Sequence, residues 1–107
     1  MIRIIIHFPY MKAAAMALFP FILIRKKDYQ YDEVLINHEM IHLQQQWEML
    51  ILPFYFAYIL NYFYNLIKYR NHHDAYFNIC FEKEAYFFEN NLNYLKHRKI
   101  WSFMNHI

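Results

Sequence analysis

The stretch INHEMIHLQQQWEML, residues 36–50, contains the pattern H-E-x-x-H. On an α-helix, residues four apart lie one turn apart on the same face, so the imidazoles of His38 and His42 can aim at one point. The residues around them are largely apolar, which is typical of a helix that faces the interior of a domain. This stretch therefore predicts a buried helix that carries two candidate metal ligands on one side.

Zinc suits these residue types. Zn²⁺ accepts neutral imidazole nitrogens at about 2.0–2.1 Å, and two histidines on one helical turn can bind the same ion. Glu39 lies about 100° around the helix from His38, so it is not a third ligand but can contact a water in the open coordination position. We therefore predict a Zn²⁺ cofactor held by His38 and His42, with Glu39 as the general base. The alternative is a pair of structural histidines beside a solvated Glu39.

A two-histidine zinc site needs a third protein ligand. The later acidic and histidine residues supply the candidates, which are Glu48, His72, His73, Asp74, Glu82, Glu84, Glu89 and His97. The segment CFEKEAYFFEN favours Glu82, because the small Ala85 three residues later lets a second helix approach the first closely. Glu84 points roughly 200° away from Glu82, so only one of the two can face the metal. Glu89 is a candidate outer partner for a histidine, and Glu84 and Glu89 stay open as replacements for Glu82.

HEMIH at residues 38–42, with EKEA at residues 82–85, resembles the gluzincin pattern of H-E-x-x-H and a later E-x-x-A. That pattern occurs in minigluzincins, ImmA/IrrE-type peptidases and the HtpX-like and CAAX-processing zinc peptidases. The resemblance implies that His38, His42 and Glu82 ligate zinc and that Glu39 acts in the hydrolysis of a peptide or protein substrate. It also implies that LFPFILI, residues 18–24, before the motif helix, is an edge strand to which an extended peptide can add.

Two further residues bear on this resemblance. Several gluzincin families place an aspartate after the alanine, where it supports a histidine, and this chain has Tyr86 there. A zinc peptidase also needs a donor that stabilises the oxyanion, often a tyrosine or a histidine. Tyr86 and His97 are near Glu82 in sequence, but the chain has eleven tyrosines, so the sequence does not choose among them.

The composition predicts one domain with more apolar residues than it can bury. The chain has 107 residues, of which 59% are hydrophobic and 22% aromatic, and it contains no glycine. A single domain over residues 1–107 cannot cover that much apolar surface, so we expect a membrane surface or a second copy of the chain to cover part of it. The net charge of +2 does not favour a nucleic acid partner. A single cysteine, Cys80, excludes an internal disulfide.

The pattern of apolar and breaking residues predicts a mainly α (α+β) fold, a zincin-like helical domain with a small N-terminal β element. Pro20 would place the second strand at an edge of the sheet, and Pro53 would end the motif helix. Asp32 and Asp74 are candidate helix caps. The predicted elements are strands at 2–8 and 18–26, a helical turn or two within 9–17, helices at 33–52, 54–70 and 74–90, and a last helical stretch within 91–104.

Residues 49–67 contain no charged side chain and are long enough to cross a membrane. A single crossing between His42 and Glu82 would separate the ligands, so we expect this helix to fold back against the core. Residues 13–24 have the length of a signal-peptide core, but the basic residues 25–27 stand where a cleavage site should be, which predicts no cleaved signal. We expect a cytoplasmic or membrane-associated protein. The alternative function is a catalytically inactive membrane-associated or protein-interaction module that retains the zincin scaffold.

Overall fold

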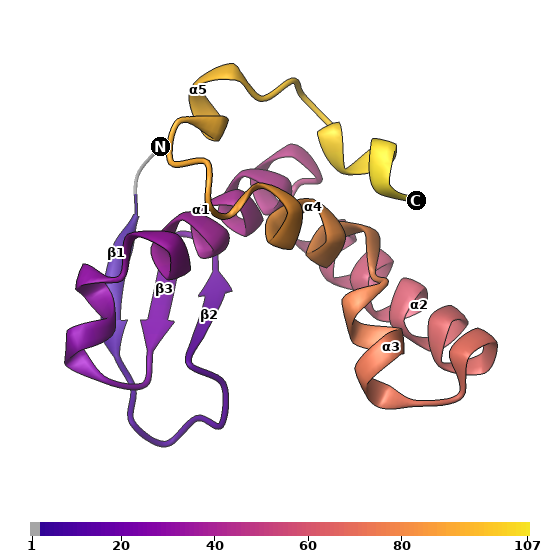
Figure 1. Ribbon diagram of the computed structural model, residues 1–107, viewed down its shortest axis with the longest axis horizontal. Coiled ribbons are helices and arrows are strands. Elements are labelled where there is room, and N and C mark those ends of the chain that lie inside the picture. Colours follow the sequence, from indigo (N-terminus) through magenta and orange to yellow (C-terminus); the bar gives the residue numbers. More distant parts are fainter. Residues whose placement is uncertain (1–2) are drawn as a thin grey trace.

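A computed structural model describes residues 3–107 (Figure 1). It confirms the predicted fold class, because the chain is mainly helical with one small three-stranded sheet near its N-terminus. The elements, in chain order, are β1 (Ile4–His7), β2 (Ala15–Leu18), β3 (Phe21–Ile24), the 3-10 helix η1 (Lys27–Tyr31), α1 (Glu33–Glu48), α2 (Leu52–Tyr69), α3 (His72–Phe77), α4 (Cys80–Phe88), α5 (Tyr94–His97) and the 3-10 helix η2 (Ser102–His106).

The sheet has the strand order β1-β3-β2, with β1 parallel and β2 antiparallel to β3. Alternate residues of a strand point to opposite faces. Ile22 and Ile24 of β3 therefore point to the same face, where they are buried against Ile36 and Leu43 of α1. This contact fixes the sheet on one side of the motif helix, as Figure 1 shows.

The predictions for the second strand and for the segment before it were wrong. Residues 18–26 do not form one strand, because Phe19 and Pro20 make a turn between β2 and β3. Because Pro20 lies in this turn, its missing N–H removes no hydrogen bond from the sheet. β3 is therefore not forced to an edge, and it is the central strand. The alanine-rich segment predicted as a helical turn forms most of β2, which is an edge strand. There the Gln46 side chain of α1 accepts from Phe19 N and donates to Ala17 O.

Helix α1 begins where the sequence predicts and ends four residues early. Asp32 Oδ1 accepts a hydrogen bond from Leu35 N, so the predicted N-cap is confirmed. Leu50 and Ile51 have positive φ angles of 59° and 65°, and the chain turns there. Pro53 lies in the first turn of α2, a position that tolerates proline because the N–H it lacks would be unpaired anyway.

The chain bends by 113° between α1 and α2, so α2 turns away from the line of α1. Within residues 3–107, no single helix is both long enough and apolar enough to cross a membrane. Together the bent pair α1 and α2 does meet the length and composition criteria.

The predicted helix over 74–90 is two helices, because the backbone at Ile79 is extended. Asn71, rather than Asp74, caps α3 by accepting from Asp74 N. Asn61 Oδ1 of α2 accepts from Cys80 N and so pairs the first N–H of α4. The predicted closing helix is likewise replaced by the short α5 and η2.

Helix α4 lies between α1 and α2. Ala85 of α4 is fully buried against Ile41 of α1, so the small side chain does lie where the two helices meet. On its other side, α4 packs Phe81 against Phe54 of α2, with ring centroids 4.7 Å apart. These two contacts bring the start of α4 beside the middle of α1.

Candidate metal centre

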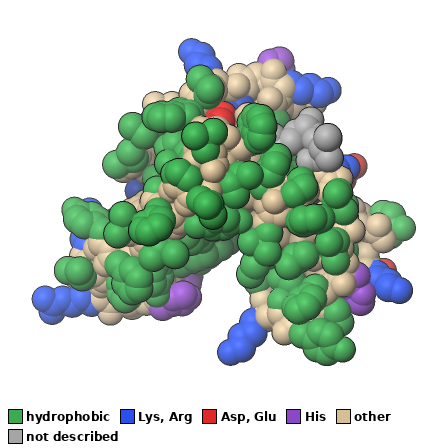
Figure 2. Space-filling view, turned by 180° about the vertical axis from the view of Figure 1, so that it is seen from behind, with side chains coloured by type: hydrophobic (Ala, Val, Ile, Leu, Met, Phe, Trp, Pro, Cys, Tyr) green, Lys and Arg blue, Asp and Glu red, His purple; other side chains and the backbone are tan. Residues whose placement is uncertain are grey.

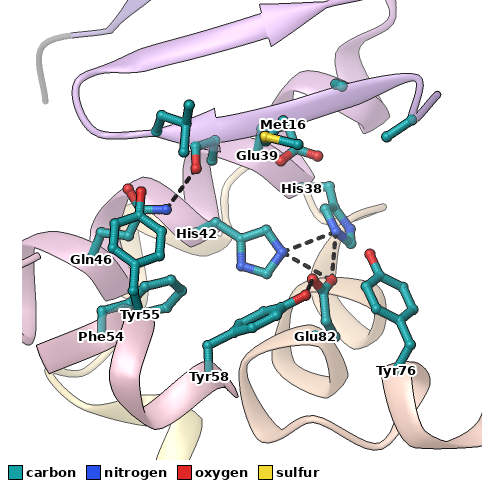
Figure 3. A pocket seen from close by; sticks show the side chains of 14 residues that line it. Met16, His38, Glu39, His42, Gln46, Phe54, Tyr55, Tyr58, Tyr76 and Glu82 are labelled. Atoms are coloured by element: carbon teal, nitrogen blue, oxygen red, sulfur yellow. Dashed lines mark hydrogen bonds and ion pairs between the residues drawn. The ribbon is translucent and has the colours of Figure 1, made fainter. Parts of the chain in front are cut away.

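Three side chains from two helices converge beside the middle of α1 (Figure 3). His38 Nε2 and His42 Nε2 of α1 lie 3.2 Å apart. Glu82 Oε1 of α4 lies 3.3 Å from His38 Nε2 and 3.0 Å from His42 Nε2. All three residues are buried, with at most 6% of each exposed. Each offers one donor atom, and these atoms lie close enough together to hold a metal ion.

The tautomer of His42 is set by a residue that sequence analysis did not single out. His42 Nδ1 lies 2.8 Å from Gln45 Oε1. The amide nitrogen of Gln45 donates to Phe81 O and to Glu84 Oε1, which fixes the amide with its oxygen toward His42. An amide oxygen only accepts, so His42 Nδ1 carries a hydrogen, and in the neutral ring Nε2 presents a lone pair to the other two donor atoms. The donor set therefore fits a cation.

Neighbouring side chains orient Glu82 and His38, the other two residues of the site. Tyr58 of α2 donates its hydroxyl to Glu82 Oε2 at 2.6 Å, which leaves Oε1 toward the histidines. His38 Nδ1 lies 3.7 Å from Glu89 Oε1, at the place where the sequence predicts an outer partner. Tyr86 packs edge-on against the His38 ring, with centroids 4.4 Å apart. No sequence pattern distinguishes Tyr58 from the other tyrosines of α2, so sequence analysis missed it.

Glu39 stands apart from the three donor atoms and faces a cavity of about 310 Å³. Among residues 3–107, no side chain or backbone group forms a hydrogen bond with its carboxylate. Burial raises the pKa of Glu39, while the nearby His42 and His38 lower it. The cavity is bounded by β2, α1, α2 and two residues beyond α2, and is lined by Ala13, Ala15, Met16, Ala17, Leu18, His38, Glu39, His42, Gln46, Phe54, Tyr55, Tyr58, Tyr76 and Glu82.

Several candidates from the sequence lie elsewhere. Glu84 is buried but points away from the donor atoms, toward Arg98. Glu48 also contacts Arg98, as its position six residues after His42 suggests. The remaining candidates, His72, His73 and Asp74 in α3 and His97 in α5, are exposed and do not line the cavity.

Arg98 joins the C-terminal segment to both ligand-bearing helices. Its guanidinium forms ion pairs with Glu48 of α1 and Glu84 of α4, and all three side chains are at most 2% exposed. Tyr94 donates its hydroxyl to Glu84 Oε2 as well. Because Glu84 also holds the Gln45 amide, an unbroken chain of hydrogen bonds runs from Arg98 to His42.

In the metal-free protein, His42 and Glu82 shift each other's pKa. Burial alone would lower the pKa of His42, but the carboxylates of Glu82 and Glu39 and the hydrogen bond that His42 donates to Gln45 raise that pKa to about 9. Burial would raise the pKa of Glu82, but His42, His38 and Tyr58 together lower it well below its usual range. A proton therefore occupies the site at neutral pH where a metal ion would otherwise supply the positive charge.

Metal binding near neutral pH is expected to release about one proton per ion, because His42 must lose its proton to become a ligand. The raised pKa stabilises the folded metal-free protein fully below pH 6.5, and that stability is lost as the pH rises through about 9. The increase in melting temperature on adding metal should therefore grow over this interval. Calorimetry in buffers of different ionisation enthalpy counts the protons, and a count near zero at neutral pH would contradict the charge state of His42.

Comparisons of the chain with protein-family models, with curated proteins and with solved structures gave no match. The chemistry of the site is therefore inferred from its own residues. These are two histidines and a glutamate that converge on one point, and a second glutamate that faces the same cavity.

Proposed function

We propose that this protein is a zinc-dependent peptidase. The observation that carries the proposal is the buried triangle of His38, His42 and Glu82 beside the free carboxylate of Glu39. A tetrahedral ion with bonds of about 2.0–2.1 Å separates its ligands by roughly 3.3 Å. The donor atoms are 3.0–3.3 Å apart. Two imidazoles with one carboxylate suit zinc, whereas calcium and magnesium prefer oxygen ligands.

Glu39 is the proposed general base. A zinc ion, when bound, would polarise the scissile carbonyl and lower the pKa of a water molecule in the cavity. Glu39 then accepts a proton from that water and passes it to the departing amine. Its burial supports this role, because burial raises the pKa of Glu39 in the metal-free protein, and a raised pKa suits a carboxylate that must both accept and donate a proton.

An extended peptide is the proposed substrate. β2 is an edge strand of the sheet and all four of its residues line the cavity. An edge strand can pair its backbone with an added peptide strand, which would lay the scissile bond along the cavity. The Gln46 side chain already pairs Phe19 N and Ala17 O at the outer edge of β2, so a peptide would pair with the part of the strand that precedes Ala17 O.

Tyr76 is the proposed donor to the oxyanion, in place of Tyr86 or His97. It lines the cavity, and Figure 3 shows its hydroxyl directed toward the side of the site where His38 lies. Tyr58 also lines the cavity, but its hydroxyl already donates to Glu82 Oε2. A donor near the ligands would stabilise the negative charge that develops on the carbonyl oxygen.

Metal removal tests the proposal directly. A chelator is expected to abolish cleavage of a mixed peptide library, and added Zn²⁺ should restore it whereas Mg²⁺ should not. Mass spectrometry of the library measures cleavage, and elemental analysis measures about one zinc per chain in the active protein. Cleavage that survives complete metal removal would overturn the proposal. A zinc-loaded protein without cleavage would instead support a metal-holding interaction module.

A further inference from the structure

The outer face of the sheet, which is turned away from α1, carries only apolar side chains. The strand registers align these residues in two rows across the sheet, Ile4–Phe21–Leu18 and Ile6–Leu23–Met16. Five of the six are 37–45% exposed, and Leu23 is partly buried. A sheet face in water usually carries polar residues, so this face has the composition of a buried one.

Helix α2 carries a second exposed apolar surface. Its inner side packs through Phe54 and Tyr58, and Asn65 is also buried there. On the opposite side, apolar residues recur at helical spacing, which makes a continuous stripe along the helix. The stripe consists of Leu52, Phe56, Ile59, Leu60, Phe63 and Ile67, each of which is 52–79% exposed.

The two apolar surfaces lie on one side of the molecule. Figure 2 views the molecule from behind, with the sheet on the right and α2 on the left, and hydrophobic side chains gather over both. Lys and Arg side chains lie mostly at the edges of this view. We call this side, made of the two rows of the sheet and the stripe of α2, the apolar face.

The segments that form the apolar face contain no acidic residue. All nine Asp and Glu residues lie within 28–48 and 74–89, whereas residues 1–27 and 49–73 contain none. The second of these segments includes Tyr64 and Tyr69 beside its basic residues, at the end of α2 where aromatic and basic side chains suit a membrane interface. The two segments hold seven of the eleven basic residues, namely Arg3, Lys12, Arg25, Lys26, Lys27, Lys68 and Arg70.

We propose that the apolar face docks on the surface of a lipid bilayer that contains anionic lipids. The apolar side chains would enter the boundary between headgroups and acyl chains, and the basic residues would lie near the lipid phosphates. A second copy of the chain fits the same face less well. A symmetric dimer would bring the same seven basic residues of each copy together without an acidic residue in either segment to pair with them.

Docking would place the cavity at the bilayer. Met16 and Leu18 belong to the apolar face and also line the cavity, so the cavity lies next to the proposed contact with lipid. If the proposed function holds, peptide segments lying on the membrane are the substrate class that reaches Glu39 most directly. This consequence depends on the proposed function, whereas docking itself does not.

Vesicle co-sedimentation of the metal-loaded full chain tests docking without reference to activity. Vesicles of phosphatidylcholine mixed with phosphatidylglycerol should bind the protein, vesicles of phosphatidylcholine alone should bind it weakly, and added salt should weaken binding. The double variant Phe56→Asp/Ile67→Asp should lower the partition coefficient at least about tenfold. Both side chains are largely exposed, so this variant should fold, and circular dichroism checks that it does. Lys68→Glu/Arg70→Glu should remove most of the preference for phosphatidylglycerol.

Phe87→Asp is the matched control for the single variant Phe56→Asp, since Phe87 in α4 is 74% exposed, close to the 73% of Phe56, but lies outside the apolar face. It should bind vesicles as well as the unaltered protein. Failure of the unaltered protein to sediment with phosphatidylglycerol vesicles would overturn the proposal, and so would an equal loss in Phe87→Asp. Sedimentation equilibrium without lipid tests the alternative, in which a second copy of the chain covers the apolar face. A dimer that Phe56→Asp/Ile67→Asp dissociates would assign the face to a second copy and would likewise overturn it.

Discussion

Replacing Glu39 with glutamine is expected to lower kcat for peptide cleavage about 10²–10⁴-fold, the usual contribution of a general base. Glutamine keeps the shape of the side chain but cannot accept the proton. Glu39 provides none of the three donor atoms, so zinc content should stay near one per chain. Peptide cleavage rates and elemental analysis of the same preparation measure both results together.

Three further results are expected if Glu39 is the base and not a ligand. Glu82→Ala removes a donor atom and should lose both zinc and cleavage, whereas Glu39→Gln should lose cleavage alone. In the metal-free protein the pKa of Glu39 should lie above 4.5, the ordinary value for glutamate, because burial raises it, and a pH titration of that form measures it. For the same reason Glu39→Gln should leave the melting temperature at neutral pH unchanged or higher. A Glu39→Gln protein that cleaves normally would exclude Glu39 as the base.

Replacing Arg98 with methionine is expected to lower the free energy of unfolding by about 3–5 kcal/mol, since it leaves two buried carboxylates without a cation. Glu48 and Glu84 have no other cationic partner in residues 3–107. Because domains of this size are stable by only about 5–15 kcal/mol, the variant should be close to unfolding. Urea denaturation followed by circular dichroism measures the loss.

A rescue variant and a neighbouring residue control this result. Arg98→Met/Glu48→Gln/Glu84→Gln contains no buried charge at this place and should recover much of the lost stability. Lys99→Met changes an exposed cation next to Arg98 and should shift stability by less than about 0.5 kcal/mol. If Arg98→Met and Lys99→Met are equally stable, Arg98 does not neutralise the two carboxylates in the way that the geometry indicates.

The parts of the site that follow from local spacing were predictable from the sequence. The i, i+4 relation put His38 and His42 on one side of a helix, and the small Ala85 three residues after Glu82 indicated where a second helix approaches. The structure brings these residues together as that spacing suggests. The N-cap at Asp32 was predictable for the same reason, since it involves neighbours within one turn.

What sequence could not supply depends on contacts between distant segments. Arg98 meets Glu48 fifty residues earlier in the chain, and Tyr58 meets Glu82 across two helices. Nothing in the local pattern ranks Tyr58 above the other tyrosines. β2 is a strand because β3 and Gln46 pair with it, even though its alanines favour a helix. The break at Ile79 likewise depends on Asn61 of another helix.

The position of Arg98 late in the chain has a consequence for synthesis. A nascent chain that has left the ribosome only as far as α4 already contains His38, His42 and Glu82. It still lacks the cation that neutralises Glu48 and Glu84, and therefore the hydrogen-bonded support that reaches His42 through Gln45. We expect stable metal loading to follow the emergence of Arg98 rather than that of the motif helix.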